Sequence, residues 1–297
     1  MNSFYLNDQL AWHHDEGHDS GYFHTYDALV VDQDIDLPRK VHVFLPREYE
    51  SNYRAYPVVY MNDGNTAFWP NGLSPYSWQV PNTLSSLYAK GKIDPVIIVA
   101  VHSLNRSHEY LHVKEFSAPF QKEGGGLSAY ADYLVRLKHF IDCSYNTLRA
   151  REFTTIIGSS HGGLAAFYTA CVHGSSFGNV GALSPSFWVG GVLNLRQTFL
   201  VKSLSPFLKP DNQNRPKIWI DWGLQHFGGP HNFFVESQAA KWGKEMVKLL
   251  QEDYEYKLDT DLFYYADPLG KHDERAWAYR FGLILEQYYK IKGSPIC

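Results

Sequence analysis

Residues 154–170 read TTIIGSSHGGLAAFYTA, and Ser160 lies between Gly158 and Gly162 where a buried strand is expected to meet a helix. This pattern is typical of a nucleophile elbow, a tight turn that strains the serine backbone and needs glycines two residues away on each side. Because the expected helix begins at His161, its backbone N–H can face negative charge on an attacked carbonyl. The alternative is a glycine-rich turn with a non-catalytic serine, since one such motif is a weak signal.

Apolar runs and amphipathic segments alternate on both sides of this turn. Strands are predicted at 28–31, 41–45, 58–61, 96–101, 180–183, 217–220 and 262–265. Helices are predicted around 80–87, 127–141, 232–250 and 273–289. The alternation predicts an α/β fold with a mostly parallel sheet, helices on both faces, and catalytic groups beyond the carboxyl ends of the strands.

The size and composition of the chain predict one globular domain over residues 1–297, with residues 1–20 as a loose extension. The 297 residues are 44% hydrophobic and 20% charged, which are ordinary globular values. The stretches 69–77 and 103–126 are long and rich in turn formers, and we expect them to cap the site. No pattern in the sequence predicts an oligomeric state.

The charge pattern excludes several classes of partner. The formal net charge is −4, and the absence of a Lys/Arg cluster argues against nucleic acid. The longest apolar run, 95–101, is far shorter than the roughly 20 residues of a membrane helix. The N-terminus does not resemble a secretory signal, so we expect a cytoplasmic protein without membrane contact. The three cysteines fit neither a zinc site nor a disulfide framework, which predicts reduced thiols.

A serine nucleophile needs a histidine base and an acid that orients it. In this architecture the chain order is serine, acid, histidine, and His272 follows the last predicted strand. The alternative for His272 is a structural helix cap. The turn after the 217–220 strand, residues 223–226, contains no carboxylate, so Asp221 and Glu236 both remain candidates for the acid.

A second donor to the oxyanion is expected from the loop after the 58–61 strand. That loop reads NDGN over residues 62–65, and the backbone N–H of Asn65 is the candidate. With the N–H of His161 it would complete an oxyanion hole. The alternative is an ordinary Asp-Gly turn.

In sequence order, several segments resemble the putative esterase family of α/β-hydrolases, which includes enterochelin, feruloyl and esterase D enzymes and the mycolyltransferases. They are VHVFLP at 41–46, YPVVYMNDG at 56–64, Asn105-Arg106 with Glu109-Tyr110, GSSHGG at 158–163, ALSPSFW at 182–188, and GKH at 270–272 with Trp277. The resemblance spans nearly the whole chain. It implies Ser160 as nucleophile, His272 as base, and the amides of Asn65 and His161 as the oxyanion hole.

The acid departs from the commonest family pattern, which has a carboxylate where this chain has His226. In the mycolyltransferase branch the acid follows a Gly-Gly insertion, and FVES at 234–237 is similar to that arrangement. The resemblance therefore favours Glu236, with Asp221 as the fallback, and some relatives resemble Ser/His dyads without an acid. It implies a small-molecule ester or thioester substrate and no cofactor. Four aromatic residues suit either a pocket for sugars, aryl acids or siderophores, or the core: Trp69, Trp78, Phe187 and Trp188.

Two other functions compete with a serine esterase. His108, Glu109 and His112 match H-E-x-x-H, which on a helix would make a zinc metallopeptidase, although the surrounding residues lack helical periodicity. The histidines of residues 13–18 suit a metal or a solvated, poorly ordered end. A hydrolase-fold binding protein that has lost its acid is the non-enzymatic alternative, and the esterase hypothesis itself includes no metal.

Overall fold

The computed structural model describes residues 2–72, 74–118, 121–190 and 194–291. Their contacts form two compact units. Unit 1 comprises Met1–Ser103, Arg136–Thr154 and Asp273–Cys297, and unit 2 comprises Leu104–Val135 and Thr155–His272. Whether the chain is one domain stays a prediction.

The strands of unit 1 pair in the order β1-β2-β3-β4-β6-β5. They are β1 (Asn2–Leu6), β2 (Gln9–His14), β3 (Gly21–Leu29), β4 (Arg39–Pro46), β5 (Val58–Met61) and β6 (Ile97–Val101). The pairs β1–β2, β2–β3, β3–β4 and β4–β6 are antiparallel. The pair β5–β6 is parallel. Every residue of β5 and β6 is buried, as expected for strands covered on both faces.

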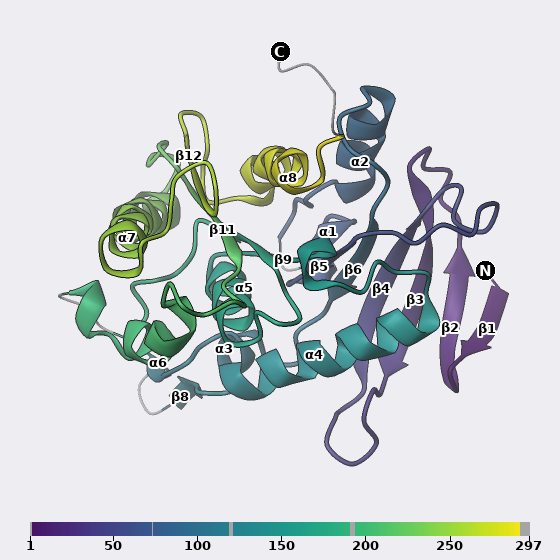
Figure 1. Cartoon of the computed structure of the whole chain (residues 1–297), viewed down its shortest axis with the longest axis horizontal. Helices are drawn as coiled ribbons and strands as arrows, with labels where there is room; N and C mark the ends of the chain where they lie inside the picture. Colours follow the sequence, from purple (N-terminus) through teal and green to yellow (C-terminus); the bar gives the residue numbers. More distant parts are fainter. Residues whose placement is uncertain (1, 73, 119–120, 191–193, 292–297) are drawn as a thin grey trace. The chain divides into compact units, whose positions relative to one another are not determined.

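The N-terminal residues, for which the sequence favours a loose end, form β1 and β2 in the structure. Figure 1 shows these strands in purple beside β3. An isolated two-stranded hairpin is at best marginally stable in water. The β1–β2 hairpin gains further backbone hydrogen bonds because β2 also pairs with β3.

The helices of unit 1 include two that pack against each other, α2 (Val80–Ala89) and α8 (Glu274–Tyr289). Val80, Leu84 and Leu87 are buried, as their helical spacing predicts. The other helical segments of unit 1 are α1 (Gly64–Ala67), the second half of α4 (Leu127–Ser144) and a 3₁₀ turn, η1 (Arg151–Phe153).

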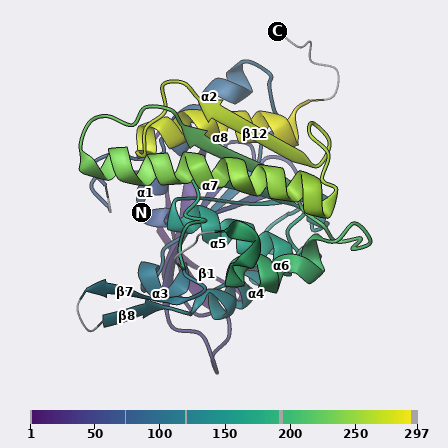
Figure 2. The same ribbon diagram turned by 90° about the vertical axis from the view of Figure 1, so that its left-hand side faces the viewer.

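Unit 2 carries a parallel sheet in the order β9-β10-β11-β12. The strands are β9 (Thr154–Ser159), β10 (Asn179–Leu183), β11 (Lys217–Gly223) and β12 (Leu262–Asp267). Helix α5 (His161–Val172) packs on β10 and α7 (Pro230–Tyr254) packs on β11, while α6 (Phe199–Leu208) packs on α5. Figure 2 shows the long α7 in front. The predicted α/β class is confirmed.

The segment 103–126 contains α3 (Arg106–Glu109) and an antiparallel hairpin of β7 (Lys114–Ala118) and β8 (Gln121–Gly124). Figure 2 shows this hairpin beside α3. Another 3₁₀ turn, η2 (Leu195–Gln197), precedes α6. Within the described ranges, no helix has both the length and the apolar character needed to cross a membrane. The cellular location expected from the sequence stays a prediction.

Candidate active site

Ser160 occupies the turn between β9 and α5 with φ 54° and ψ −122°, a conformation that L-residues rarely adopt. The turn is held from both sides: Ser160 N–H donates to the Leu183 carbonyl at 2.9 Å, and the Ser160 carbonyl accepts from Ser186 N–H at 3.0 Å. A Cβ on Gly163 would lie 3.1 Å from two backbone oxygens, so a glycine suits that position. The strained, half-exposed serine is the geometry predicted for an elbow.

His272 lies in the loop between β12 and α8, and its imidazole is buried against Glu236 of α7. Nδ1 of His272 lies 2.6 Å from Oε2 of Glu236. The side chains are 3% and 0% exposed, respectively. A short, buried contact between a carboxylate and an imidazole fixes the ring orientation and favours the tautomer with the proton on Nδ1. The other ring nitrogen, Nε2, is then the one able to accept a proton.

The carboxylate of Glu236 accepts hydrogen bonds from three donors. Besides His272, the hydroxyl of Ser184 donates to Oε1 at 2.9 Å, and the backbone N–H of Gly223 donates to the same oxygen. A buried carboxylate is costly unless donors of this kind satisfy its lone pairs. The environment of Glu236 is therefore built for an ionised carboxylate facing His272.

Asp221, the other candidate acid, is also fully buried but has different partners. Its Oδ2 accepts from Trp219 Nε1 at 2.9 Å, and its Oδ1 accepts from Ser184 N–H at 3.3 Å. These contacts join the carboxyl ends of β10 and β11. The structure thus brings His272 together with Glu236, whereas these two bonds of Asp221 support the sheet.

Asn232, near the start of α7, fixes the backbone beside the imidazole. Its Oδ1 accepts from His272 N–H at 2.7 Å, and its Nδ2 donates to the carbonyls of Gln225 and Phe227 at 2.7 and 2.8 Å. Gln225 N–H also donates to the Gly270 carbonyl at 3.0 Å. Two loops of unit 2 are therefore tied together at His272.

Sequence reasoning assigned no role to Ser184, Ser186, Gly223 or Asn232. Ser186 is fully buried, and its Oγ lies 3.3 Å from Ser160 Oγ, with either hydroxyl able to donate. Ser184 has φ 41°, which turns the chain sharply after β10. The available signal was the SPS sequence directly after a buried strand, because polar residues at the carboxyl end of a parallel strand lie at the edge where α/β sites form.

Gly223 offers a test of how tightly this region is packed. A Cβ at this position would lie 2.2 Å from the Gly270 carbonyl oxygen and 3.0 Å from Glu236 Oε1. We expect Gly223→Ala to lower the free energy of unfolding by about 2–3 kcal/mol, because backbone would have to move. Urea denaturation measures this change.

The matched control for that variant is Gly282→Ala in α8. An added Cβ there would make ordinary van der Waals contact with Thr83 at 3.4 Å. Alanine is favoured over glycine inside helices by about 0.5–1 kcal/mol, so this variant should be as stable as the parent or more stable. Equal stability of the two variants would contradict the packing argument at Gly223.

The two predicted oxyanion donors lie in different units. His161 is the first residue of α5 in unit 2, at the positive end of the helix dipole. Arg106 Nη1 lies 3.5 Å from His161 Nδ1, which brings a cation close to the elbow. Asn65 lies in α1 of unit 1, after Asp63, whose φ of 57° makes the turn from β5. The pairing of these two amides stays a prediction.

The H-E-x-x-H segment does not form the metallopeptidase arrangement. Helix α3 ends at Glu109, so His108 and His112 do not lie on one helical face. His108 Nδ1 contacts the Gly124 carbonyl at 3.0 Å, and Glu109 accepts from Leu104 N–H at 2.9 Å. His112 stacks on Phe199, and burial lowers the pKa of its imidazole to about 4.

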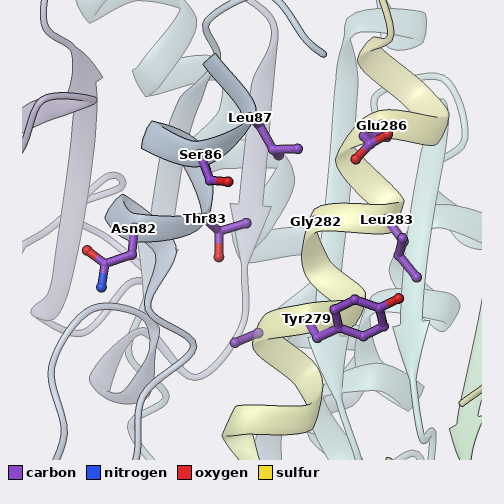
Figure 3. Close-up of a pocket in the computed structure, with 9 residues that line it drawn as sticks. Asn82, Thr83, Ser86, Leu87, Tyr279, Gly282, Leu283 and Glu286 are labelled. Atoms are coloured by element: carbon purple, nitrogen blue, oxygen red, sulfur yellow. The ribbon is translucent and has the colours of Figure 1, made fainter. Parts of the chain in front are cut away.

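A separate cavity of about 320 Å³ lies between α2 and α8 in unit 1. Figure 3 shows Thr83 and Ser86 of α2 opposite Gly282 and Glu286 of α8. None of the described residues that line it is a histidine, and Ser160, Glu236 and His272 are not among them. Of the aromatic residues considered for a pocket, Trp78 and Phe187 are buried in the core, and Trp69 and Trp188 are partly exposed.

Comparison with known proteins gives a family match over most of the chain. The family model described as "Putative esterase" matches residues 33–288. YjcH of Bacillus subtilis is 33% identical over 219 residues, which cover 72% of this chain and 80% of YjcH. YbbA of the same organism is 26% identical over 171 residues, which cover 57% of this chain and 64% of YbbA. The matched region thus spans just under two thirds of YbbA.

Among solved structures, the siderophore hydrolase EstA from Aspergillus nidulans superposes with a TM-score of 0.63 at 17% identity. The alignment covers 93% of this chain and 98% of EstA. At this identity the likeness concerns the fold. It confirms the predicted α/β-hydrolase fold.

Proposed function

Because the chain belongs to the putative esterase family, we propose that it is a serine hydrolase that cleaves a carboxylic ester or thioester through a covalent acyl-enzyme. The observation that carries the proposal is the buried contact of His272 with Glu236, in the unit that also holds the strained Ser160. A serine elbow without an oriented imidazole would remain a poor nucleophile.

In this mechanism Ser160 Oγ attacks the ester carbonyl while His272 Nε2 takes its proton. Glu236 holds the imidazole through Nδ1 and stabilises the imidazolium that forms. The amides of His161 and Asn65 stabilise the oxyanion, and each such donor typically lowers the barrier by about 3 kcal/mol. His272 then protonates the leaving alcohol or thiol. Water, activated by the same imidazole, releases the acyl group.

The proposal makes no use of a cofactor, and its substrate class is a small-molecule ester. EstA is a siderophore hydrolase by name, so siderophore esters are the first substrates to test, and a catecholate lactone is one of them. The other substrates of the screen are p-nitrophenyl acyl esters, feruloyl esters and S-formylglutathione. We expect saturable hydrolysis of at least one substrate, and we expect it to be insensitive to chelators. Hydrolysis that stops on chelation would point instead to metal catalysis.

The non-enzymatic alternative rests on His226 in the usual position of the acid. Its Nε2 lies 3.3 Å from the Gly223 carbonyl, and it therefore supports the turn after β11. The carboxylate of Glu236 contacts His272 from α7 instead, which supports Glu236 as the acid and the esterase over the binding protein. A binding protein would bind ligands without hydrolysing any substrate of the screen.

A further inference from the structure

The β2–β3 hairpin of unit 1 places two histidines face to face. His13 and His24 are directly opposite each other in the antiparallel register, so their side chains project from the same side of the sheet. His13 Nδ1 lies 3.4 Å from His24 Nε2. Neither imidazole belongs to the proposed catalytic machinery.

Glu50, which follows β4, adds a carboxylate to this pair. One ligand atom from each of His13, His24 and Glu50 lies within 4.8 Å of the other two. Within the described part of the chain, this is the one group of three His, Cys, Asp or Glu side chains with that geometry. Residues from three separate segments, not one run of sequence, therefore converge here.

The distance between the two nitrogens suits a shared metal ion. Zinc binds imidazole nitrogen at about 2.0–2.1 Å, and a tetrahedral angle then separates two such ligands by about 3.3–3.4 Å. Two imidazoles with one carboxylate form a zinc ligand set that leaves a fourth position for water. His24 is buried, His13 half-buried and Glu50 exposed, so an ion can reach the site from solvent.

A hydrogen-bonded chain behind His24 orients it for metal binding. His24 Nδ1 lies 3.3 Å from the Tyr145 hydroxyl, which lies 2.8 Å from the Tyr26 hydroxyl. If Nδ1 donates along this chain, the lone pair of Nε2 faces His13, as a ligating imidazole requires.

Tyr22 supplies a second polar group beside the cluster. It is 5% exposed, and its hydroxyl lies close to the Glu50 carboxylate, although the contact does not have normal hydrogen-bond geometry. A water on a metal ion bound by Glu50 would give the buried hydroxyl a partner.

We propose that His13, His24 and Glu50 bind a zinc ion that fastens the N-terminal hairpin to the rest of unit 1. Among the described strands, β2 pairs with β1 and β3, so the ion would join this edge to β3 and to the segment after β4. Because the ion binds the folded protein, it raises the free energy of unfolding by RT ln(1 + L/Kd), where L is the free zinc concentration.

The test uses full-length protein without a polyhistidine tag, stripped with a chelator and then titrated with zinc by calorimetry. We expect one equivalent to bind and to raise the Tm. In His13→Gln and Glu50→Gln, the affinity should fall on the order of 100-fold and the Tm increase should vanish. Cobalt(II) should give the visible spectrum of a tetrahedral site in the parent and not in these variants.

His18→Gln is the matched control, because His18 belongs to the same histidine-rich tract but not to the cluster. It should keep both the zinc affinity and the Tm increase. Three results would each overturn the proposal. The first is that the parent shows no saturable zinc binding, and the second is that His13→Gln and Glu50→Gln bind zinc as the parent does. The third is that His18→Gln loses zinc binding. None of these measurements uses ester hydrolysis, so the result is independent of the proposed esterase activity.

Discussion

Ser160→Ala is expected to reduce kcat for ester hydrolysis by roughly 10⁶-fold, because it removes the proposed nucleophile. Alanine fits the strained turn as well as serine does, and the substitution removes only the hydroxyl that faces Ser186 Oγ at 3.3 Å. The Tm should therefore change little. Covalent labelling by a fluorophosphonate, followed by mass spectrometry, should be complete in the parent and absent in the variant.

Ser186→Ala is the control for this experiment, since Ser186 presents the nearest buried hydroxyl. It lies after β10, outside the elbow, so its substitution should leave labelling in place. Labelling that survives in Ser160→Ala and disappears in Ser186→Ala would move the nucleophile to Ser186. Labelling absent from the parent would favour the binding protein.

Several strands of each unit were predictable because they are short, buried and apolar. Residues 58–61 and 180–183 lie within β5 and β10, and the predicted helix at 273–289 agrees with α8 within one residue. The predicted strand at 28–31 overlaps β3 only at residues 28 and 29. Polar residues interrupt β3, and its register shifts between Tyr26 and Leu29, so no apolar run marks the whole strand.

The N-terminal hairpin escaped prediction for a related reason. β1 and β2 carry mostly exposed or half-buried side chains, so they lack the clean alternation by which a half-buried strand is recognised. β2 joins the sheet through its pairing with β3, which no apolar run marks as a whole. The convergence of His13 with Glu50 depends on this pairing and on that of β3 with β4, so the histidine-rich tract alone could not predict it.

At the candidate site, the motif and the chain order predicted Ser160 and His272. For the acid, the residues alone left Asp221 and Glu236 open, and the family resemblance favoured Glu236 with Asp221 as the fallback. Both acids are fully buried. Their difference lies in which side chain each carboxylate meets, and that depends on how α7 packs on β11. Sequence spacing carries no information about that contact, which places Glu236 Oε2 against His272.

Glu236→Gln is expected to lower kcat by about 10⁴-fold with little change in KM. The glutamine oxygen can keep the bonds from Gly223 and Ser184, which both reach Oε1. Its NH₂ group then faces His272 Nδ1 and donates to it, which favours the tautomer with the proton on Nε2. In that tautomer Nε2 cannot accept the Ser160 proton. Steady-state kinetics on the best substrate of the ester screen measure the effect.

Asp221→Asn is the matched comparison, because it also neutralises a fully buried carboxylate on the same sheet edge. Its contacts with Trp219 and Ser184 do not involve the imidazole, so kcat should fall by less than about tenfold. Thermal unfolding of both variants separates an effect on stability from an effect on catalysis. A large decrease in Asp221→Asn with parent-like Glu236→Gln would reverse the assignment of the acid. Parent-like kcat in both folded variants would mean that His272 acts with Ser160 as a dyad, and that the buried contact with Glu236 is structural.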